Sequence, residues 1–255
     1  MEDDGMINVC ILRIEGTNCE QETYDAFLEL GANPHLVHLE ELKHQNLLDY
    51  QCLMLPGGFS SGDYVRAGAI FAARIKSTVH ATLEKFIKMG YPVGGICNGF
   101  QILVELGVLP RISEHPEACL STNDSARFEC RPTLLKLENH CAFTQKMDIG
   151  GIYEIPSAHA EGKFVSPLID ELVENNQVIF RYVSPEGEYA GYPWNPNGSP
   201  YNIAGICNEE GNVFGMMPHP ERAFHRYQNQ DWTRNGSGAH GRLFFESVLE
   251  YARRL

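Results

Sequence analysis

The sequence predicts an α/β fold of three layers, in which helices cover both faces of an open, mostly parallel sheet. Residues 7–14 (INVCILRI) form a continuous apolar run, of the kind that a parallel sheet buries on both faces. Strand-like and helix-like segments then alternate along the first part of the chain, which is typical of a doubly wound sheet. Within residues 92–103 (PVGGICNGFQIL), a glycine-flanked cysteine marks a place where a strand turns directly into a helix.

The remaining elements follow from hydrophobic periodicity and turn signals. The expected helices cover residues 19–30 (ended by Gly31), 79–89, 100–106 and 242–253. Further strands are expected at 34–39, 52–55 and 178–182, with strand-like pieces within 121–137 and at 152–157. After a turn at 195–199 (NPNGS), a hairpin is expected from 202–207 and 212–216. No repeat or linker interrupts the chain, so we expect one domain over residues 1–255.

Composition narrows the class of protein. The chain has 255 residues, 43% of them hydrophobic, and a net charge of −13. The negative charge argues against a nucleic-acid partner and against binding to anionic membranes. No apolar run is long enough to span a bilayer, and the acidic start MEDDGM is unlike a signal peptide, so we expect a cytoplasmic protein. The eight cysteines show no paired C-x-x-C spacing, which favours reduced thiols and argues against a structural zinc site.

Cys97 is the first candidate for catalysis. Gly95 and Gly99 bracket it in the G-x-nucleophile-x-G pattern of a nucleophile elbow, with cysteine in place of serine. A side chain at such a turn has a strained backbone, so its neighbours must be small. The N-terminus of the following helix stabilises a thiolate and a developing oxyanion. The alternative is a buried structural cysteine in a glycine-rich turn.

A glycine loop follows the expected strand at 52–55. Gly57 and Gly58 free backbone N–H groups at the carboxyl end of a strand, where open α/β sheets place their sites. Taken alone, these glycines are better explained as an ordinary turn. The length of the loop and its paired Asp63 and Arg66 suggest more than a turn, although a solvated ion pair would give the same pattern.

A nucleophilic cysteine needs a base and a group that orients the base. His219 follows a strand-like run and stands between Pro218 and Pro220, which restrict its backbone. If this segment is extended, Glu221, two residues on, projects to the same side as His219 and is placed to accept a hydrogen bond from its Nδ1. His159 in the run SAHAEG is the rival base. A metal site at His219 and Glu221 is disfavoured because the spacing supplies no third ligand.

Four motifs together resemble one enzyme family. The order of glycine loop, G-x-C-x-G elbow and late His-x-Glu is that of class I (triad) glutamine amidotransferases, whose sheet is flavodoxin-like. PGGFSSGDYVRAGAI, GICNGFQIL, NPNGS and GMMPHPERA resemble, more narrowly, the glutaminase subunits of phosphoribosylformylglycinamidine synthases. The resemblance covers nearly the whole chain. It implies a glutaminase that supplies ammonia for the ATP-dependent amidation of formylglycinamide ribonucleotide in purine synthesis.

The resemblance also implies roles for individual residues. Cys97 attacks the carboxamide of L-glutamine to form a γ-glutamyl thioester, His219 moves the protons, and Glu221 orients His219. The backbone N–H groups of Gly58 and Asn98 form the oxyanion hole. Three residues are implied to help hold glutamine: Gln101, Arg127 and Phe128. No metal and no cofactor is implied for this chain, whereas ATP and Mg²⁺ belong to a partner synthetase.

Two partners are implied: a small bridging subunit, and a larger separate subunit that is the synthetase. Residues 43–51 and 228–238 match no motif of the family, which suggests surface or partner-facing segments. Two other classes stay open. A stand-alone cysteine hydrolase of the same fold predicts robust activity from the isolated chain. A non-catalytic protein that kept the fold predicts no reaction of Cys97 with a glutamine-like electrophile such as diazo-oxo-norleucine.

Overall fold

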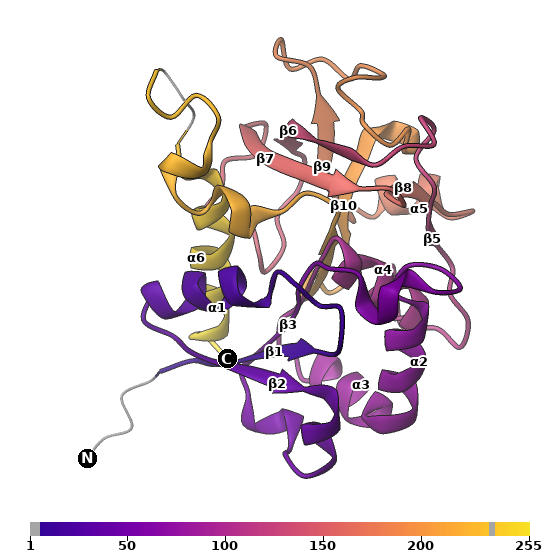
Figure 1. Ribbon diagram of the computed structural model, residues 1–255, viewed down its shortest axis with the longest axis vertical. Helices are drawn as coiled ribbons and strands as arrows, with labels where there is room; N and C mark the ends of the chain where they lie inside the picture. Colours follow the sequence, from indigo (N-terminus) through magenta and orange to yellow (C-terminus); the bar gives the residue numbers. More distant parts are fainter. Residues whose placement is uncertain (1–5, 235–237) are drawn as a thin grey trace.

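One sheet runs through the centre of the computed structural model, which describes residues 6–234 and 238–255 (Figure 1). In this described part the sheet has nine strands in the order β2-β1-β3-β4-β11-β10-β9-β6-β7. Its strands are β1 Asn8–Arg13, β2 Asn33–His38, β3 Cys52–Leu55, β4 Val93–Ile96, β6 Glu129–Leu137, β7 Ile152–His159, β9 Val178–Val183, β10 Ile203–Cys207 and β11 Val213–Met216. A separate ribbon pairs β5 Cys119–Ser121 with β8 Lys163–Val165.

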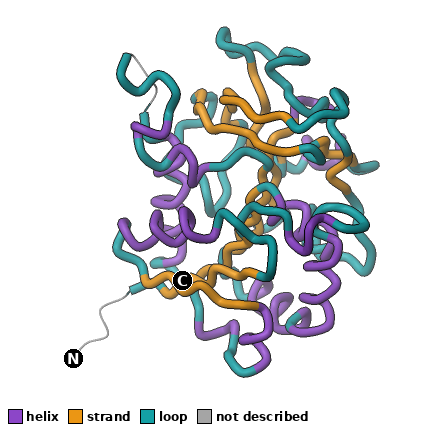
Figure 2. The backbone as a smooth tube through the Cα atoms, in the orientation of Figure 1, coloured by secondary structure: helices purple, strands orange, loops and turns teal. Residues whose placement is uncertain are grey.

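The sheet changes character at β11. Strands β2, β1, β3, β4 and β11 are parallel neighbours, whereas β10, β9, β6 and β7 continue the sheet in antiparallel pairs. The central parallel strands β3, β4 and β11 are buried along their whole length because helices cover both of their faces. Figure 2 shows the strands as one continuous band through the molecule.

Helices form the two outer layers. They are α1 Glu20–Glu29, α2 Ala69–Thr78, α3 His80–Lys88, α4 Asn98–Leu106, α5 Ile169–Glu174 and α6 His240–Ala252. In Figure 1, α1 and α6 lie on one side of the parallel strands, and α2, α3 and α4 lie on the other. Phe27 of α1 meets Phe245 of α6 edge to face, with ring centroids 5.1 Å apart. The α/β fold in three layers is therefore confirmed.

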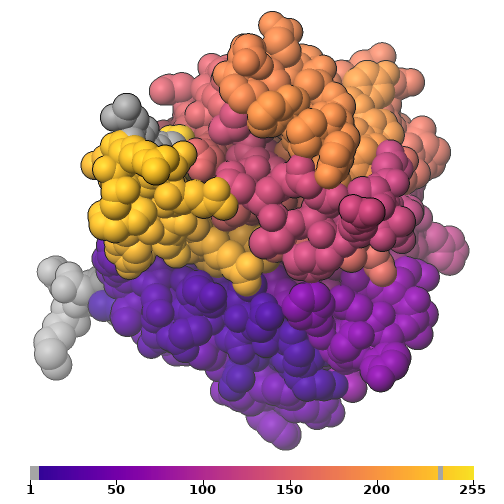
Figure 3. Space-filling view, turned by 45° about the horizontal axis from the view of Figure 1, so that its top comes forward, coloured from indigo at the N-terminus to yellow at the C-terminus, as the bar shows by residue number. Residues whose placement is uncertain are grey.

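The two ends of the described chain meet on one face. Figure 3 shows the C-terminal segment (yellow) lying against the N-terminal segment (indigo), where α1 contacts α6 and the short 3-10 turn η5, Pro220–Ala223. The loops after β1, β3, β4 and β11 all leave the same edge of the sheet, because these strands are parallel. That edge therefore collects chain segments far apart in the sequence.

Several elements predicted from the sequence agree closely with the structure. The hairpin β10–β11 forms as expected, and the first and last expected helices correspond to α1 and α6. The helix after the cysteine starts at Asn98, two residues earlier than expected. Helix α2 was not expected, because the glycine-rich run before it suggested a loop; Gly68, with a φ of +79°, starts the helix abruptly. The short strands β5 and β8 and the short helix α5 were also not predicted from the sequence.

Some expectations concern the surface and the termini. Within residues 43–51, Leu47 and Tyr50 are buried, so part of this segment packs against the core. In 228–238, Trp232 is half exposed, and residues 235–237 lie outside the described residues, as do residues 1–5 of the acidic start. The eight cysteines carry no disulfide. No helix among the described residues has the length and apolarity needed to cross a bilayer.

Candidate active site

Cys97 lies at the tip of a sharp turn between β4 and α4. Its φ of +51° and ψ of −105° are strained for a residue with a side chain, as a nucleophile elbow requires. A Cβ on Gly95 would stand 2.6 Å from the Gly99 carbonyl oxygen, and a Cβ on Gly99 would stand 1.8 Å from the Leu55 carbonyl oxygen. The flanking glycines are therefore required by close backbone approach. The thiol itself donates to the Ala158 carbonyl oxygen at 3.6 Å.

The start of α4 points toward the same sulfur. Asn98 is the first residue of this helix, and the first N–H groups of a helix have no acceptor in a preceding turn. Gly58 of the glycine loop lines the same cavities as Cys97. The two residues assigned to the oxyanion hole therefore come from the start of α4 and from the glycine loop after β3, and both elements reach Cys97.

His219 comes from the end of β11 and is buried. Its backbone N–H donates to the Pro156 carbonyl oxygen at 2.8 Å, which ties the loop to β7. Pro220 starts the turn η5, so Glu221 stands in a 3-10 helix and not in the extended segment that the sequence suggested. The turn still brings the Glu221 carboxylate to 2.5 Å from Nδ1 of His219. Nε2 of His219 is thereby left facing away from Glu221.

The opposite charges of His219 and Glu221 stabilise each other. Burial alone would lower the pKa of His219, but the Glu221 carboxylate and the Cys97 sulfur outweigh burial and raise that pKa well above its usual value. Burial would likewise raise the pKa of Glu221, but the charge and hydrogen bond of His219 lower it. These interactions therefore favour an imidazolium at His219 beside a carboxylate at Glu221, next to the candidate nucleophile.

Two adjoining cavities open at Cys97. The wider one, of about 220 Å³, is lined by Cys97 and His219 together with Cys19, Gly58 and Phe128, among others. The narrower one, of about 50 Å³, is lined by Cys97, Gln101, His159 and Glu161, among others. Cys97, Gly58 and Phe128 line both. The structure thus brings the predicted nucleophile, the predicted base and one predicted oxyanion donor to one place.

A polar network connects the loops around the narrow cavity. The side-chain amide of Asn98 donates to Gln101 at 3.0 Å, and its oxygen accepts from the backbone N–H of Ser60 at 3.2 Å. Gln101 in turn donates to the Glu161 carbonyl oxygen at 2.6 Å. The glycine loop, the elbow helix and the loop after β7 are therefore held together by two amide side chains.

The ion pair between Asp63 and Arg66, the alternative for this loop, does not form in the structure. Arg66 instead binds the Glu105 carboxylate through two hydrogen bonds of 2.5 Å, because α4 presents Glu105 beside the loop. Asp63 lies 3.4 Å from the Asn98 amide nitrogen. Burial and the neighbouring Glu161 raise the pKa of Asp63 to about 6. Asp63 therefore contributes an acceptor to the rim of the narrow cavity.

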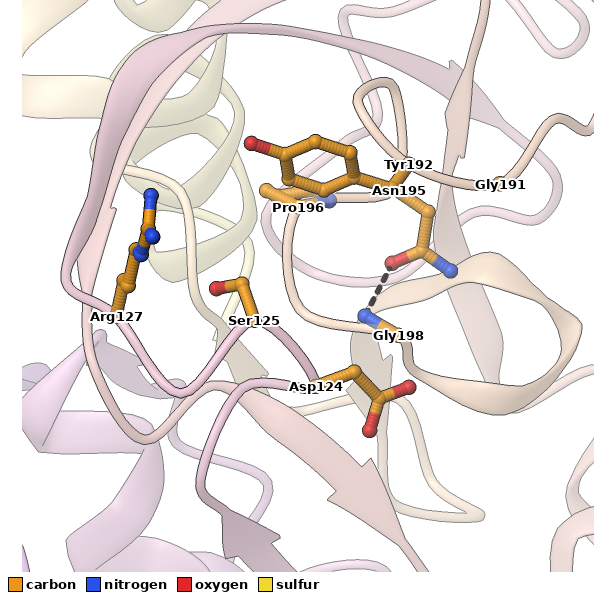
Figure 4. A pocket seen from close by; sticks show the side chains of 8 residues that line it. All are labelled: Asp124, Ser125, Arg127, Gly191, Tyr192, Asn195, Pro196 and Gly198. Carbon is orange, nitrogen blue, oxygen red and sulfur yellow. Dashed lines mark hydrogen bonds between the residues drawn. The ribbon is translucent and has the colours of Figure 1, made fainter.

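Phe128 and Arg127, which were expected to hold the substrate together with Gln101, line different cavities in the structure. Phe128 lines both cavities at Cys97, and its ring is half exposed. Arg127 lines a different, larger cavity of about 540 Å³, opposite Tyr192 and Asn195 (Figure 4). In that cavity the Asn195 oxygen accepts from the Gly198 N–H at 3.0 Å, so its wall is a closed turn. A role for Arg127 at the elbow stays a prediction that its position does not favour.

Sequence reasoning missed Cys19 and Arg222. Cys19 is buried, with its sulfur 3.9 Å from Nδ1 of His219, and Arg222 donates to that sulfur at 3.2 Å. The position of Cys19 just after β1, at the edge that collects the other site residues, was the available signal.

In the fold, Cys19 supplies a third potential metal ligand beside His219 and Glu221, which the sequence spacing did not provide. Ligand atoms of Cys19, His219 and Glu221 lie within 4.8 Å of one another. The Arg222 guanidinium already brings positive charge to this group, with its Nε 4.0 Å from the Glu221 carboxylate. The positive charge of Arg222 would repel a metal cation bound here. The absence of a functional metal stays a prediction.

Comparison with known proteins places this geometry in a family. Residues 6–252 match the model of a CobB/CobQ-like glutamine amidotransferase domain. A relative from Archaeoglobus fulgidus, phosphoribosylformylglycinamidine synthase subunit PurQ, is 52% identical, and the match covers 98% of each chain. The subunit PurQ of Picrophilus torridus is 46% identical over 92% of this chain and 94% of its own length.

Solved structures agree with the sequence relatives. A chain in the structure of PurLQS from Thermotoga maritima superposes with a TM-score of 0.78 at 36% identity, covering 96% of this chain and 99% of that one. Another glutamine amidotransferase from Thermotoga maritima shares only the fold, with a TM-score of 0.53 at 17% identity over 97% of this chain and 96% of that one. The chain belongs to the PurQ family of phosphoribosylformylglycinamidine synthase subunits, within the glutamine amidotransferases.

Proposed function

We propose that this chain hydrolyses L-glutamine and passes the ammonia to a synthetase partner, which amidates formylglycinamide ribonucleotide. The observation that carries the proposal is the strained Cys97 at the same cavity as His219, with Glu221 2.5 Å behind the imidazole. Membership of the PurQ family indicates that the substrate of this site is L-glutamine. The arrangement gives each residue a chemical role.

The first half of the reaction uses the charge state of the site. The Cys97 thiolate attacks the carboxamide carbon, and the oxygen takes up negative charge between the N–H groups of Gly58 and Asn98. His219, held as an imidazolium by Glu221, gives its proton to the nitrogen as the carbon–nitrogen bond breaks. Ammonia leaves, and a γ-glutamyl thioester remains on Cys97.

In the second half, neutral His219 takes a proton from water, and the hydroxide attacks the thioester carbon. The carbon–sulfur bond breaks, glutamate forms, and the site returns to a thiolate beside an imidazolium. Gln101 contributes by fixing the loop after β7 against α4, next to the substrate. Phe128 lines both cavities at Cys97, and we assign this one reaction to residues 1–255 as a single domain.

The partners of the proposal follow from the relatives. The Thermotoga maritima structure is of PurLQS, an assembly of three kinds of subunit. We assign this chain two partners in the cytoplasm: a synthetase, which binds ATP and Mg²⁺, and a small bridging subunit. This chain needs no cofactor of its own for thioester chemistry.

Cys97→Ala in the assembled complex tests the proposal. Glutamine-dependent synthesis is expected to disappear, because the thioester can no longer form, whereas ammonia-dependent synthesis is expected to persist at the synthetase. Loss of both activities in a correctly assembled complex would contradict this division of labour. Robust glutamine hydrolysis by the isolated chain, unchanged by partners, would favour a stand-alone hydrolase instead.

A further inference from the structure

His159 is a buried imidazole beside Cys97 that the proposed mechanism leaves without a role. It is the last residue of β7, and only 3% of it is exposed. It lines the narrow cavity together with Cys97 and Gln101. Its Nε2 atom is buried and has no hydrogen-bond partner within the part of the chain that the structure describes. Buried polar atoms are almost always paired, so this one requires an explanation.

The tautomer of His159 follows from its neighbour Asn123. The amide nitrogen of Asn123 donates to the carbonyl oxygens of Arg127 at 2.9 Å and His159 at 2.8 Å, which fixes the orientation of this amide. The Asn123 oxygen therefore accepts, both from the Gly162 N–H at 3.1 Å and from Nδ1 of His159 at 3.1 Å. Nδ1 carries the proton, and Nε2 presents a lone pair.

The ring is also neutral under working conditions. Burial, and next the positive charge of His219, lower the pKa of His159 to about 4. At neutral pH the imidazole therefore holds one proton, and the Asn123 amide keeps that proton on Nδ1. Nε2 can only accept a hydrogen bond.

Among the described residues, no side chain that lines the narrow cavity donates a hydrogen bond to Nε2. Asp63 and Glu161 contribute carboxylates, which accept. The side-chain amide nitrogen of Gln101 donates instead to the Glu161 carbonyl oxygen. A ligand bound in this cavity can supply the donor that Nε2 lacks.

We propose that Nε2 of His159 accepts a hydrogen bond from an N–H group of the bound glutamine, which makes His159 a substrate-positioning residue. This inference rests on the proposed glutaminase function. Glutamine offers two such nitrogens, the carboxamide at the reacting end and the α-ammonium at the other. Either donor satisfies the lone pair, and either one distinguishes glutamine from a ligand that carries only acceptors there.

Two matched variants in the assembled complex test the proposal. His159→Asn keeps an amide N–H near the position of Nδ1 for Asn123 but removes the acceptor at Nε2. We expect the KM for glutamine to rise about 5- to 30-fold, the loss of one hydrogen bond, with a much smaller change in kcat. His159→Gln places an amide oxygen near the position of Nε2, and we expect it to recover part of the lost affinity. Ammonia-dependent synthesis by the same complex reports whether each variant folds and assembles.

Glutamate γ-methyl ester identifies the donor. This ester keeps the α-ammonium but has no carboxamide N–H. If the KM penalty of His159→Asn persists with the ester, the α-ammonium is the donor; if the penalty disappears, the carboxamide is. Both results support the proposal. An unchanged KM for glutamine in His159→Asn, with active wild-type complex, overturns it. Absence of glutamine-dependent synthesis in wild type would instead refute the proposed function itself.

A direct measurement avoids any change at position 159. The Cys97→Ala chain, labelled with nitrogen-15 histidine and held in its complex, binds glutamine without turning it over. The Nε2 resonance of His159 is expected to start as that of an unprotonated nitrogen and to move upfield as it accepts a hydrogen bond. A resonance that stays in place while glutamine saturates the site overturns the proposal.

Discussion

Gly57 is expected to control the position of His219, although it takes no part in the chemistry. A Cβ at position 57 would stand 2.6 Å from Cε1 of His219 and 3.3 Å from the Cys19 sulfur. An ordinary contact begins at 3.4 Å, so Gly57→Ala requires the ring to move by about 0.8 Å. The backbone at Gly57 is not in a conformation reserved for glycine, so the effect comes from this contact.

The ring has little freedom to move without losing function. Its backbone N–H is bound to Pro156, Nδ1 is bound to Glu221, and only 2% of the residue is exposed. A shift approaching 1 Å in a catalytic group costs roughly 10²-fold in rate. We therefore expect Gly57→Ala to lower kcat for glutamine by about that factor, with a smaller effect on KM.

The assay is glutamine-dependent against ammonia-dependent synthesis by the assembled complex. Gly191→Ala is the matched control, because a Cβ there meets nothing within 4 Å and its φ is ordinary. Ammonia-dependent synthesis should stay at the wild-type level in both variants. A Gly57→Ala complex with wild-type kcat for glutamine would show that His219 tolerates this displacement, and the geometric argument would be refuted.

Two further predictions concern the buried charges. Glu221→Gln removes the carboxylate that keeps His219 protonated and oriented, so kcat should fall roughly 10³- to 10⁴-fold; a pH titration of His219 by NMR should show its pKa falling, and an unchanged pKa would contradict the assignment. Folding lowers the pKa of His159 from 6.5 to about 4. As the pH falls, the unfolded chain therefore binds the proton first. The contribution of His159 to the free energy of unfolding is present above pH 6.5 and is lost as the pH falls toward 4. Urea unfolding should show wild type losing roughly 3 kcal/mol relative to His159→Asn across that window, and parallel curves would refute it.

The parts of the fold that the sequence could predict are those with strong local signals. Continuous apolar runs marked β1 and β3, and the glycine pattern marked the elbow, because each reflects burial or close approach within a few residues. Helix α2 was missed because its N-terminus follows a glycine with positive φ and no side-chain cap, so the usual start signal is absent. Strands β6 and β7 were recognised only in pieces, because buried residues alternate with more exposed ones along them and no continuous apolar run marks them.

The candidate site shows the same division. Cys97, His219 and Glu221 were predictable because each stands in a short motif with its own chemistry. Cys19 and Arg222 were not, because only the folded chain brings the loop after β1 to the loop after β11. The exchange of partners between Asp63, Arg66 and Glu105 has the same cause, since Glu105 lies two helices and a strand away in sequence. Local motifs mark candidate reacting groups, whereas the residues that surround those groups are identified only in the fold.

The choice between the two histidines was the one question that neither motif settled by itself. Both rings are almost completely buried, so burial lowers the proton affinity of each. Their Nδ1 partners differ in charge: His219 meets the Glu221 carboxylate, and His159 meets the Asn123 amide oxygen. A carboxylate at 2.5 Å outweighs burial and a neutral amide does not, so the two pKa values move apart. One ring is thereby suited to donate and recover a proton at the sulfur, and the other to hold the substrate without competing for that proton.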